Sequence, residues 1–349
     1  MLNNKPNIFE FAPRELSQDA VFCYVLDCFN YPEKRQLAVD FLNLIHFPRT
    51  DSIAKIRIKR QEDKIDVKAI VTYTDGSRKY LIIEDKVYTS EHDNQLQRYK
   101  AATVKREKCA PEDIVGLYFK IGQPTVWERT VCEKAGYGIL EYTDFLAYTE
   151  KAAQTDACLQ DFYEFFKQRC AFYQMIDTCS FETLDDSTFE EIMWNRYGQR
   201  KIMHWMMQSI FGPQFNERKL NEVNNFGKPC TQYRFIFDRA STPAEWGLTP
   251  ADFPQRGYDC FFRLDHSAQG WYISIRQYFR NGTTDEETKF SALKRAMVLR
   301  EMGLEKDESL NRVASKEKTL VLFHIDSVAS VKKLLPKLTK AVGYLLTTQ

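Results

Sequence analysis

Two carboxylates and a lysine, Asp66, Glu84 and Lys86, are the residues of this chain whose types and spacing favour chemistry. Residues 65–73 and 80–86 both read as β-strands, with Asp66 near the start of the first and Glu84 and Lys86 at the end of the second. Two carboxylates a few ångströms apart need a positive charge between them, and a hard cation such as Mg²⁺ prefers such oxygen ligands. Lys86 could stabilise charge on a phosphate or help to deprotonate a water. The set favours metal-assisted hydrolysis of a phosphodiester.

A three-residue turn at 74–76 is expected to bring the two carboxylates together. Its last residue is a glycine, which suits a position that needs positive φ. In that register Tyr73 faces Ser77 and, counting outward, Asp66 lies directly opposite Glu84. A two-residue turn would shift the pairing by one and turn Asp66 to the apolar side, so the residue pattern selects the longer turn.

Strand alternation gives this hairpin one charged face and one apolar face. We expect Asp66, Lys68, Glu84 and Lys86 on the charged face. The apolar face collects Ile65, Val67, Ala69, Val71, Leu81 and Ile83. A Glu-x-Lys at a strand end is by itself more often a solvated salt bridge, and the two lysines could balance the carboxylates without a metal. The spacing alone leaves both interpretations open.

A predicted helix follows, with residues 90–93 as its N-terminal cap and with Gln95 and Tyr99 four apart on one face. Together with Asp66 and the Ile-Glu-Asp-Lys sequence at 83–86, this order of motifs resembles the PD-(D/E)XK nuclease superfamily. It is most similar to the bacterial branch in which a helix with a Gln-Leu-x-x-Tyr signature follows the active-site strand. The acid at 66 follows isoleucine where the superfamily often has proline.

The resemblance implies a set of metal ligands. Asp66 and Glu84 would bind the ion, and the backbone carbonyl of Asp85 would add a third oxygen. The side chain of Asp85 is expected on the other face of the strand, which leaves its role open. The segment Arg-Glu-Leu-Ser-Gln-Asp-Ala near the N-terminus resembles the opening helix of that branch, where a glutamate, here Glu15, is an outer ligand. The alternative for Glu15, and equally for Asp19, is a partner for the positive end of the helix dipole.

The resemblance also implies an activity. Lys86 would be the catalytic lysine, and Gln95 and Tyr99 would support the site or contact a phosphate. The expected enzyme is a Mg²⁺-dependent nuclease, with Mn²⁺ as a substitute, that cleaves DNA in phage defence, restriction or mobile-element biology. RNA cleavage is an alternative that these residues do not separate from DNA cleavage.

A non-catalytic nucleic-acid-binding or scaffold protein on the same fold is the competing function. The net charge is only +1, so the whole chain has no general attraction for nucleic acid. Residues 55–60 alternate Lys or Arg with Ile and would present one basic strand face close to Asp66. That face is the best candidate for contact with a substrate backbone.

A chain of 349 residues suits two domains, which we place at 1–178 and 179–349. The first is expected to be an α/β domain with a restriction-endonuclease-like mixed sheet flanked by helices, and the second an α+β domain. Nine cysteines without a Cys-x-x-Cys pair favour free thiols in a reducing cytoplasm. Since the N-terminus has no apolar signal core and no apolar run approaches about 18 residues, we expect a cytoplasmic protein without a membrane segment.

Periodicity predicts the remaining elements. Expected helices lie near 17–30, 33–46, 143–148, 159–175, 189–211, 285–302 and 327–346. Expected strands, besides the hairpin, lie near 53–60, 114–119, 138–142, 233–237, 258–264, 271–278 and 319–325. The second half carries Arg234, Arg263, Arg276, Tyr278 and Arg280 on its strands. These could read phosphates or bases, or be the wet side of a half-buried sheet, and the position of this half suggests substrate choice or homodimer formation.

Overall fold

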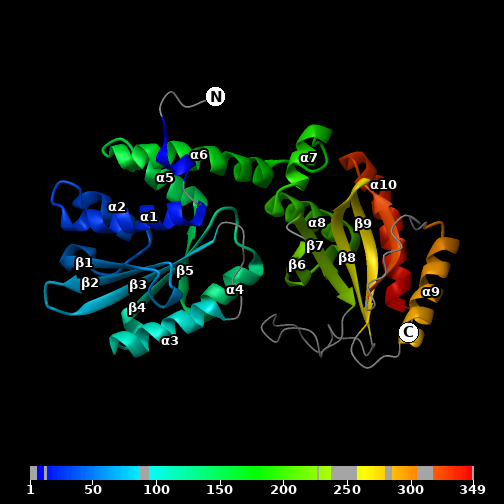
Figure 1. Cartoon of the computed structure of the whole chain (residues 1–349), viewed down its shortest axis with the longest axis horizontal. Helices are drawn as coiled ribbons and strands as arrows, with labels where there is room; N and C mark the ends of the chain where they lie inside the picture. Colours follow the sequence, from blue (N-terminus) through cyan, green and yellow to red (C-terminus); the bar gives the residue numbers. More distant parts are fainter. Residues whose placement is uncertain are drawn as a thin grey trace. The chain divides into compact units, whose positions relative to one another are not determined.

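The structure, a computed structural model, describes residues 6–11, 14–86, 94–225, 228–236, 258–279, 285–304 and 317–347. The side chains of residues 14–15, 218, 221–225, 228–229, 279 and 285–291 lie outside this description. The chain divides into two compact units, Met1–Asp177 and Thr178–Gln349 (Figure 1). That each half folds as an independent domain stays a prediction. In the part of the chain that is described, no helix is long and apolar enough to cross a membrane.

A mixed five-stranded sheet, in the order β1-β2-β3-β4-β5, forms the centre of the first unit. The pairs β1/β2 and β2/β3 are antiparallel, whereas β3/β4 and β4/β5 are parallel. The strands are β1 (Ile53–Arg60), β2 (Val67–Tyr73), β3 (Arg78–Lys86), β4 (Ile114–Lys120) and β5 (Tyr137–Glu141). Parallel neighbours need crossover connections, which α3 (Gln95–Glu107) and α4 (Val126–Ala135) provide.

Helices cover both faces of this sheet (Figure 1). One face carries α3 and α4, and the other carries α1 (Arg14–Asp27), α2 (Arg35–Leu44), α5 (Tyr142–Ala152) and α6 (Ala157–Thr178). The predicted class is thereby confirmed: this is an α/β fold with a restriction-endonuclease-like mixed sheet flanked by helices. Short 3₁₀ turns lie at Ile8–Glu10, Cys28–Asn30, Thr50–Ser52, Glu62–Lys64 and Pro111–Asp113.

An aromatic core fills the space between the sheet and α1. The ring of Phe22 in α1 lies 5.4 Å from that of Phe119 in β4 and 4.9 Å from that of Phe145 in α5. Phe166 of α6 joins Phe145 at 5.5 Å. Each such pair contributes about 0.5–1.5 kcal/mol beyond the burial of its area. This core fixes α1 against β4, which pairs with β3, the strand that carries Glu84.

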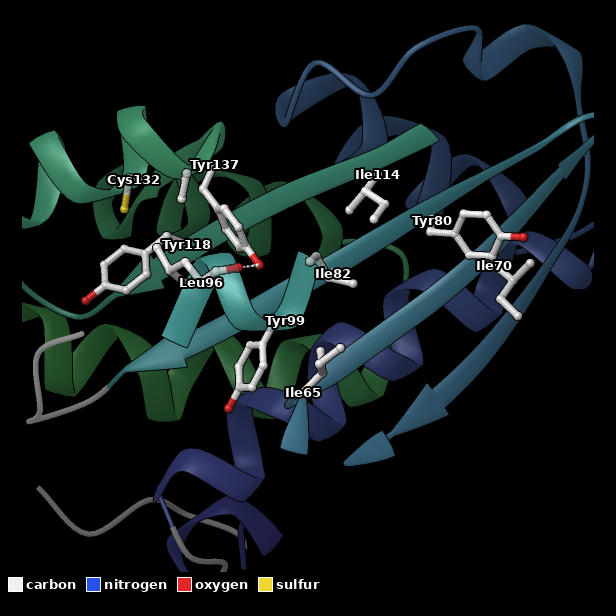
Figure 2. Packing of buried hydrophobic residues seen from close by; sticks show 11 residues of the cluster. Ile65, Ile70, Tyr80, Ile82, Leu96, Tyr99, Ile114, Tyr118, Cys132 and Tyr137 are labelled. Carbon is white, nitrogen blue, oxygen red and sulfur yellow. Dashed lines mark hydrogen bonds between the residues drawn. The ribbon is translucent and has the colours of Figure 1, made fainter. Parts of the chain in front are cut away.

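A second apolar cluster lies between the sheet and α3 (Figure 2). The Tyr137 hydroxyl donates to the carbonyl of Leu96 at 3.1 Å, which ties β5 to the first turn of α3. Gly116 allows this packing, because a Cβ atom there would lie 2.7 Å from the Tyr137 ring. The predicted charged face of the hairpin is therefore a covered face, and Glu84 and Lys86 are both buried at its end.

Helix α4 was not predicted, although its start and end have recognisable signals. Thr125 and Glu128 form a capping box in which each side chain accepts from the backbone N–H of the other. Gly136 ends the helix with φ of 65°. Helix α5 also extends four residues beyond its predicted end, to Ala152.

The second unit has a fully antiparallel sheet in the order β10-β9-β8-β7-β6. Its strands are β6 (Leu220–Asn225), which was not predicted, β7 (Lys228–Ile236), β8 (Tyr258–Ser267), β9 (Gly270–Phe279) and β10 (Glu317–His324). Its helices are α7 (Asp186–Met193), α8 (Arg196–Phe211), α9 (Asp285–Glu301) and α10 (Val328–Thr347), with 3₁₀ turns at Gly212–Gln214 and Glu217–Lys219. The single long helix predicted at 189–211 is wrong, because Asn195 breaks it. Its side chain accepts from the N–H groups of Tyr197 and Gly198 and begins a new helix.

The strand arginines of this unit are held by carboxylates. Arg263 lies 2.8 Å from Asp265 and 3.5 Å from Glu317, and Arg276 lies 2.5 Å from Glu317. These guanidinium groups are engaged within the sheet, which supports the structural interpretation over a phosphate-reading surface. Arg280 lies outside the described residues.

Candidate active site

The hairpin of β2 and β3 has the predicted register. The N–H of Tyr73 donates to the carbonyl of Ser77 at 2.9 Å, and Gly76 has φ of 82°. Val67 pairs with Ile83 at the far end of the ladder. Asp66 precedes Val67 at this end, and its Oδ2 accepts from the backbone N–H of Asp85 at 3.0 Å, so its carboxylate lies at the end of β3 that carries Glu84 and Lys86.

The backbone before β2 leaves the strand path, which corrects one expectation. Asp63 and Lys64 have positive φ values of 58° and 66° and lie in the 3₁₀ turn before the strand. Ile65 therefore escapes strand alternation and packs in the cluster under α3, instead of on the predicted apolar face with Val67. Figure 2 shows Ile65 close to Tyr99 in this cluster. The turn delivers Asp66 to the end of β3.

Glu84 is a buried carboxyl group whose charged form is disfavoured by its surroundings. Its side chain is 1% exposed, and it forms an ion pair with Lys86. Apart from that pair, its two oxygens have no hydrogen-bond partner in the described part of the chain. Burial, and then the nearby charge of Asp66, raise the pKa of Glu84 to about 8. One lysine thus does not balance the two carboxylates.

Lys86 remains the cation of the site. Burial lowers the pKa of Lys86, but the charges of Glu84 and Asp66 raise it more, so the pKa lies above its ordinary value. A lysine that holds its proton this firmly is better suited to stabilising negative charge than to removing a proton from water.

Lys68, the other lysine of the predicted charged face, does not serve the carboxylate pair. It is completely buried and forms ion pairs with Glu62 and, at 2.7 Å, with Glu107 at the end of α3. These two ion pairs connect α3 with the 3₁₀ turn before β2. The interpretation in which two lysines balance Asp66 and Glu84 without a metal loses one of its two cations.

Replacement of Lys68 tests this structural role. We expect Lys68→Met to lower the free energy of unfolding by about 3 kcal/mol, because it leaves Glu62 and Glu107 beside a buried apolar side chain. Urea denaturation at pH 7 measures the change. Lys59→Met is the control: Lys59 also pairs with Glu62, at 2.6 Å, but is partly exposed, and we expect a loss below about 1 kcal/mol. Equal losses in the two variants would contradict the assigned role of Lys68.

Gln95 and Tyr99 lie together in the first turns of α3, as the signature predicts. The Gln95 amide donates to the Tyr99 hydroxyl at 2.6 Å. Burial raises the pKa of Tyr99, and the negative charges of Glu84 and Asp66 add to this effect although the bond from Gln95 opposes it. The hydroxyl therefore stays protonated close to the carboxylates. The cap predicted at 90–93 lies outside the described residues, and α3 as described begins at Gln95.

The backbone N–H and the side-chain carboxylate of Asp85 have different partners. Its backbone N–H donates to Oδ2 of Asp66 at 3.0 Å. Its carboxylate lies on the α1 side, where the Gln18 amide nitrogen donates to both oxygens at 2.8 and 2.7 Å, with the amide oriented to satisfy these bonds. Gln18 was not singled out from the sequence, although it lies three residues after Glu15 in α1. The side chain of Glu15 itself lies outside the described residues.

The donor set fits a hard divalent cation. Within the described ranges no three His, Cys, Asp or Glu side chains gather into a metal site. Asp66 and Glu84 provide two carboxylates, and the predicted third oxygen is a backbone carbonyl, that of Asp85. Burial and the nearby Asp66 disfavour the charged form of Glu84, whose oxygens lack hydrogen bonds, and a divalent cation would stabilise that charged form.

The mixed five-stranded sheet with helices on both faces defines the restriction-endonuclease-like class of fold. The comparison with known families agrees with this class. Residues 12–174 match the family model of the PD-(D/E)XK nuclease superfamily, and this part of the chain belongs to that superfamily. No curated protein and no solved structure matches the chain.

Proposed function

We propose that the protein is a metal-dependent nuclease that hydrolyses phosphodiester bonds, with DNA as its substrate. The observation that carries the proposal is the buried Glu84, which faces Asp66 with only Lys86 against it among the described residues. A pair of carboxylates under this electrostatic stress is costly for a protein that only binds or supports another molecule. Membership of residues 12–174 in a nuclease superfamily supports the same activity.

Asp66, Glu84 and the carbonyl of Asp85 would hold Mg²⁺, or Mn²⁺ in its place, with Glu15 as an outer ligand. The ion, when bound, supplies a water of lowered pKa and positive charge beside the phosphate. Lys86 keeps its proton and stabilises the negative charge that develops on the phosphate.

Gln95 and Tyr99 complete the proposed machinery. The Tyr99 hydroxyl accepts from Gln95 and keeps its own proton to donate to a phosphate oxygen or to a carboxylate. Burial of the surrounding side chains strengthens each of these interactions, because little water competes for them.

The basic edge strand β1 is the proposed contact for the DNA backbone. Lys55 and Arg57 are exposed, and Arg57 pairs with Ile70 of β2, the strand that follows Asp66. We expect the double variant Lys55→Gln/Arg57→Gln to bind DNA about tenfold more weakly. The slope of log affinity against log salt concentration should fall by about two, because two phosphate contacts are lost.

Fluorescence anisotropy with labelled duplex DNA, in Ca²⁺ to prevent cleavage, measures both quantities. Lys332→Gln/Lys333→Gln in α10 is the control, since it removes the same charge from the second unit. An equal loss of affinity in both double variants would contradict the assignment of β1.

The activity itself is tested with purified full-length protein. Plasmid, linear duplex, single-stranded DNA and RNA are incubated with Mg²⁺ or Mn²⁺, and with EDTA in parallel. Cleavage of DNA that needs a metal and is lost in Asp66→Asn is the expected result. Preference for RNA would change the proposed substrate from DNA to RNA. No cleavage of any substrate with either metal would favour the alternative, a non-catalytic nucleic-acid-binding or scaffold protein. The net charge of +1 is the observation that favours that alternative.

The resemblance to the bacterial branch supports the biological setting that we propose, a cytoplasmic enzyme of phage defence. The role of the second unit in substrate choice or in a homodimer belongs to the same proposal. Gel filtration with light scattering distinguishes the homodimer from the monomer.

A further inference from the structure

Asp85 connects helix α1 to the carboxylate pair. The Gln18 side chain is 1% exposed and directs its amide nitrogen to both Asp85 oxygens. The Asp85 residue is 3% exposed, and its backbone N–H donates to Asp66. A continuous series of hydrogen bonds thus runs from α1 through β3 to Asp66. We refer to the bond between the Gln18 amide and the Asp85 carboxylate as the Gln18–Asp85 clamp.

The place of the clamp in the strand makes it relevant to the site. Asp85 stands between Glu84 and Lys86, whose side chains point to the opposite face. A carboxylate buried at this point without donors would cost several kcal/mol, so the strand would rotate or shift to reach water. Such a shift would move the Asp85 N–H away from Asp66 and change the spacing of the pair. The two bonds from the Gln18 amide oppose such a shift.

We infer that Gln18 is a positioning residue, which through Asp85 holds the Asp85 N–H against Asp66 and so fixes the Asp66 carboxylate opposite Glu84. This inference rests on the proposed function only for its consequence, the binding of a divalent cation. Groups that orient metal ligands in this way change metal affinity by about 10–100-fold when they are removed.

The competing explanation is that the clamp only stabilises the fold. A variant that removes both partners separates the two explanations, since replacing both members of a buried polar pair by apolar groups is nearly neutral for stability. Gln18→Leu/Asp85→Leu is that variant.

Two measurements on the full chain test the inferred role of Gln18. Backbone amide exchange by NMR reports on the Asp85 N–H without any metal, and calorimetric titration reports on the affinity for Mn²⁺. We expect the leucine pair to lose protection at the Asp85 amide while Ile82 in the same strand keeps it, and to bind Mn²⁺ at least tenfold more weakly.

A matched control removes another buried glutamine bond. Thr231 in β7 donates to Gln199 in α8 at 2.8 Å, and both residues are buried in the second unit. Gln199→Leu/Thr231→Val should leave the Asp85 amide and the Mn²⁺ affinity unchanged.

Wild-type protection and wild-type Mn²⁺ affinity in a folded leucine pair would overturn the inference, and so would unchanged protection at the Asp85 amide by itself. If the wild type binds no Mn²⁺ and cuts nothing, the proposed function fails. The exchange data then still decide whether Gln18 holds the Asp85 amide against Asp66.

Discussion

Lys86→Met is expected to abolish the nuclease activity, with a fall in kcat of about 10³-fold or more. The structure gives the physical reason: Lys86 is the cation against Glu84 within the described residues, and its raised pKa keeps it charged at neutral pH. Methionine keeps most of the unbranched side chain and removes the ammonium group with its charge and donors. The affinity for Mn²⁺ should not fall, because Lys86 competes with the ion for the Glu84 carboxylate.

Single-turnover cleavage of duplex DNA in saturating Mg²⁺, together with calorimetry, measures the two quantities. Lys79→Met is the matched control, since Lys79 lies in the same strand but forms its ion pair with Asp113 at the opposite end, at 3.0 Å. The control should keep its activity within about threefold. Activity near the wild-type level in Lys86→Met would remove this lysine from the mechanism.

The hairpin was predictable because two independent local rules agree on it. The glycine at position 76 demands a turn with positive φ, and the apolar alternation of the strands rejects any register that buries Asp66 among aliphatic side chains. Both rules act within about 20 residues of sequence. The register through Val67 and Ile83 was therefore fixed before any tertiary contact was known.

The partners of the charged residues could not be predicted in this way, because they depend on contacts distant in sequence. Lys68 was assigned to the site from strand alternation, yet its ion-pair partner Glu107 lies 39 residues away in the sequence, in α3. Gln18 and Asp85 meet only because the aromatic core holds α1 over β3. Sequence patterns predict which face a side chain points to, but the helix that covers that face decides its partner.

The missed elements had local signals that a hydrophobic pattern does not contain. The capping box of Thr125 and Glu128 marks the start of α4, and Asn195 marks the break between α7 and α8. Polar capping residues therefore mark helix ends that apolar periodicity alone does not reveal: it missed α4 and merged α7 with α8.

The raised pKa of Glu84 predicts that its replacement by glutamine has a large effect on the free energy of unfolding. In the metal-free protein the pKa of Glu84 lies at about 8, above the ordinary value of 4.5 that it regains on unfolding. Between these values the native state binds a proton that the unfolded state releases, so stability falls as the pH rises through this window and levels off above it. One pH unit of pKa difference corresponds to about 1.4 kcal/mol, which sets an upper bound of roughly 5 kcal/mol. Glu84→Gln should remove this penalty and stabilise the protein.

Urea denaturation in EDTA from pH 5 to pH 9 measures the difference between Glu84→Gln and the wild type. The gain should be small at pH 5 and increase steadily to several kcal/mol at the top of the range. Mg²⁺ should then stabilise the wild type alone, because the variant lacks the carboxylate that the ion binds.

Glu128→Gln is the control variant. It tests whether the expected gain in stability comes from the missing partners of Glu84 or from the burial of a carboxylate alone. Glu128, in the first turn of α4, is also buried, but it accepts from Lys120 at 2.7 Å and from Tyr118 at 3.0 Å. Its replacement should destabilise the protein at neutral pH, since it breaks charged hydrogen bonds that are already satisfied. If Glu84→Gln also destabilised the protein across the whole range, the carboxylate pair would be balanced without a metal, and the case for an ion at Asp66 and Glu84 would be lost.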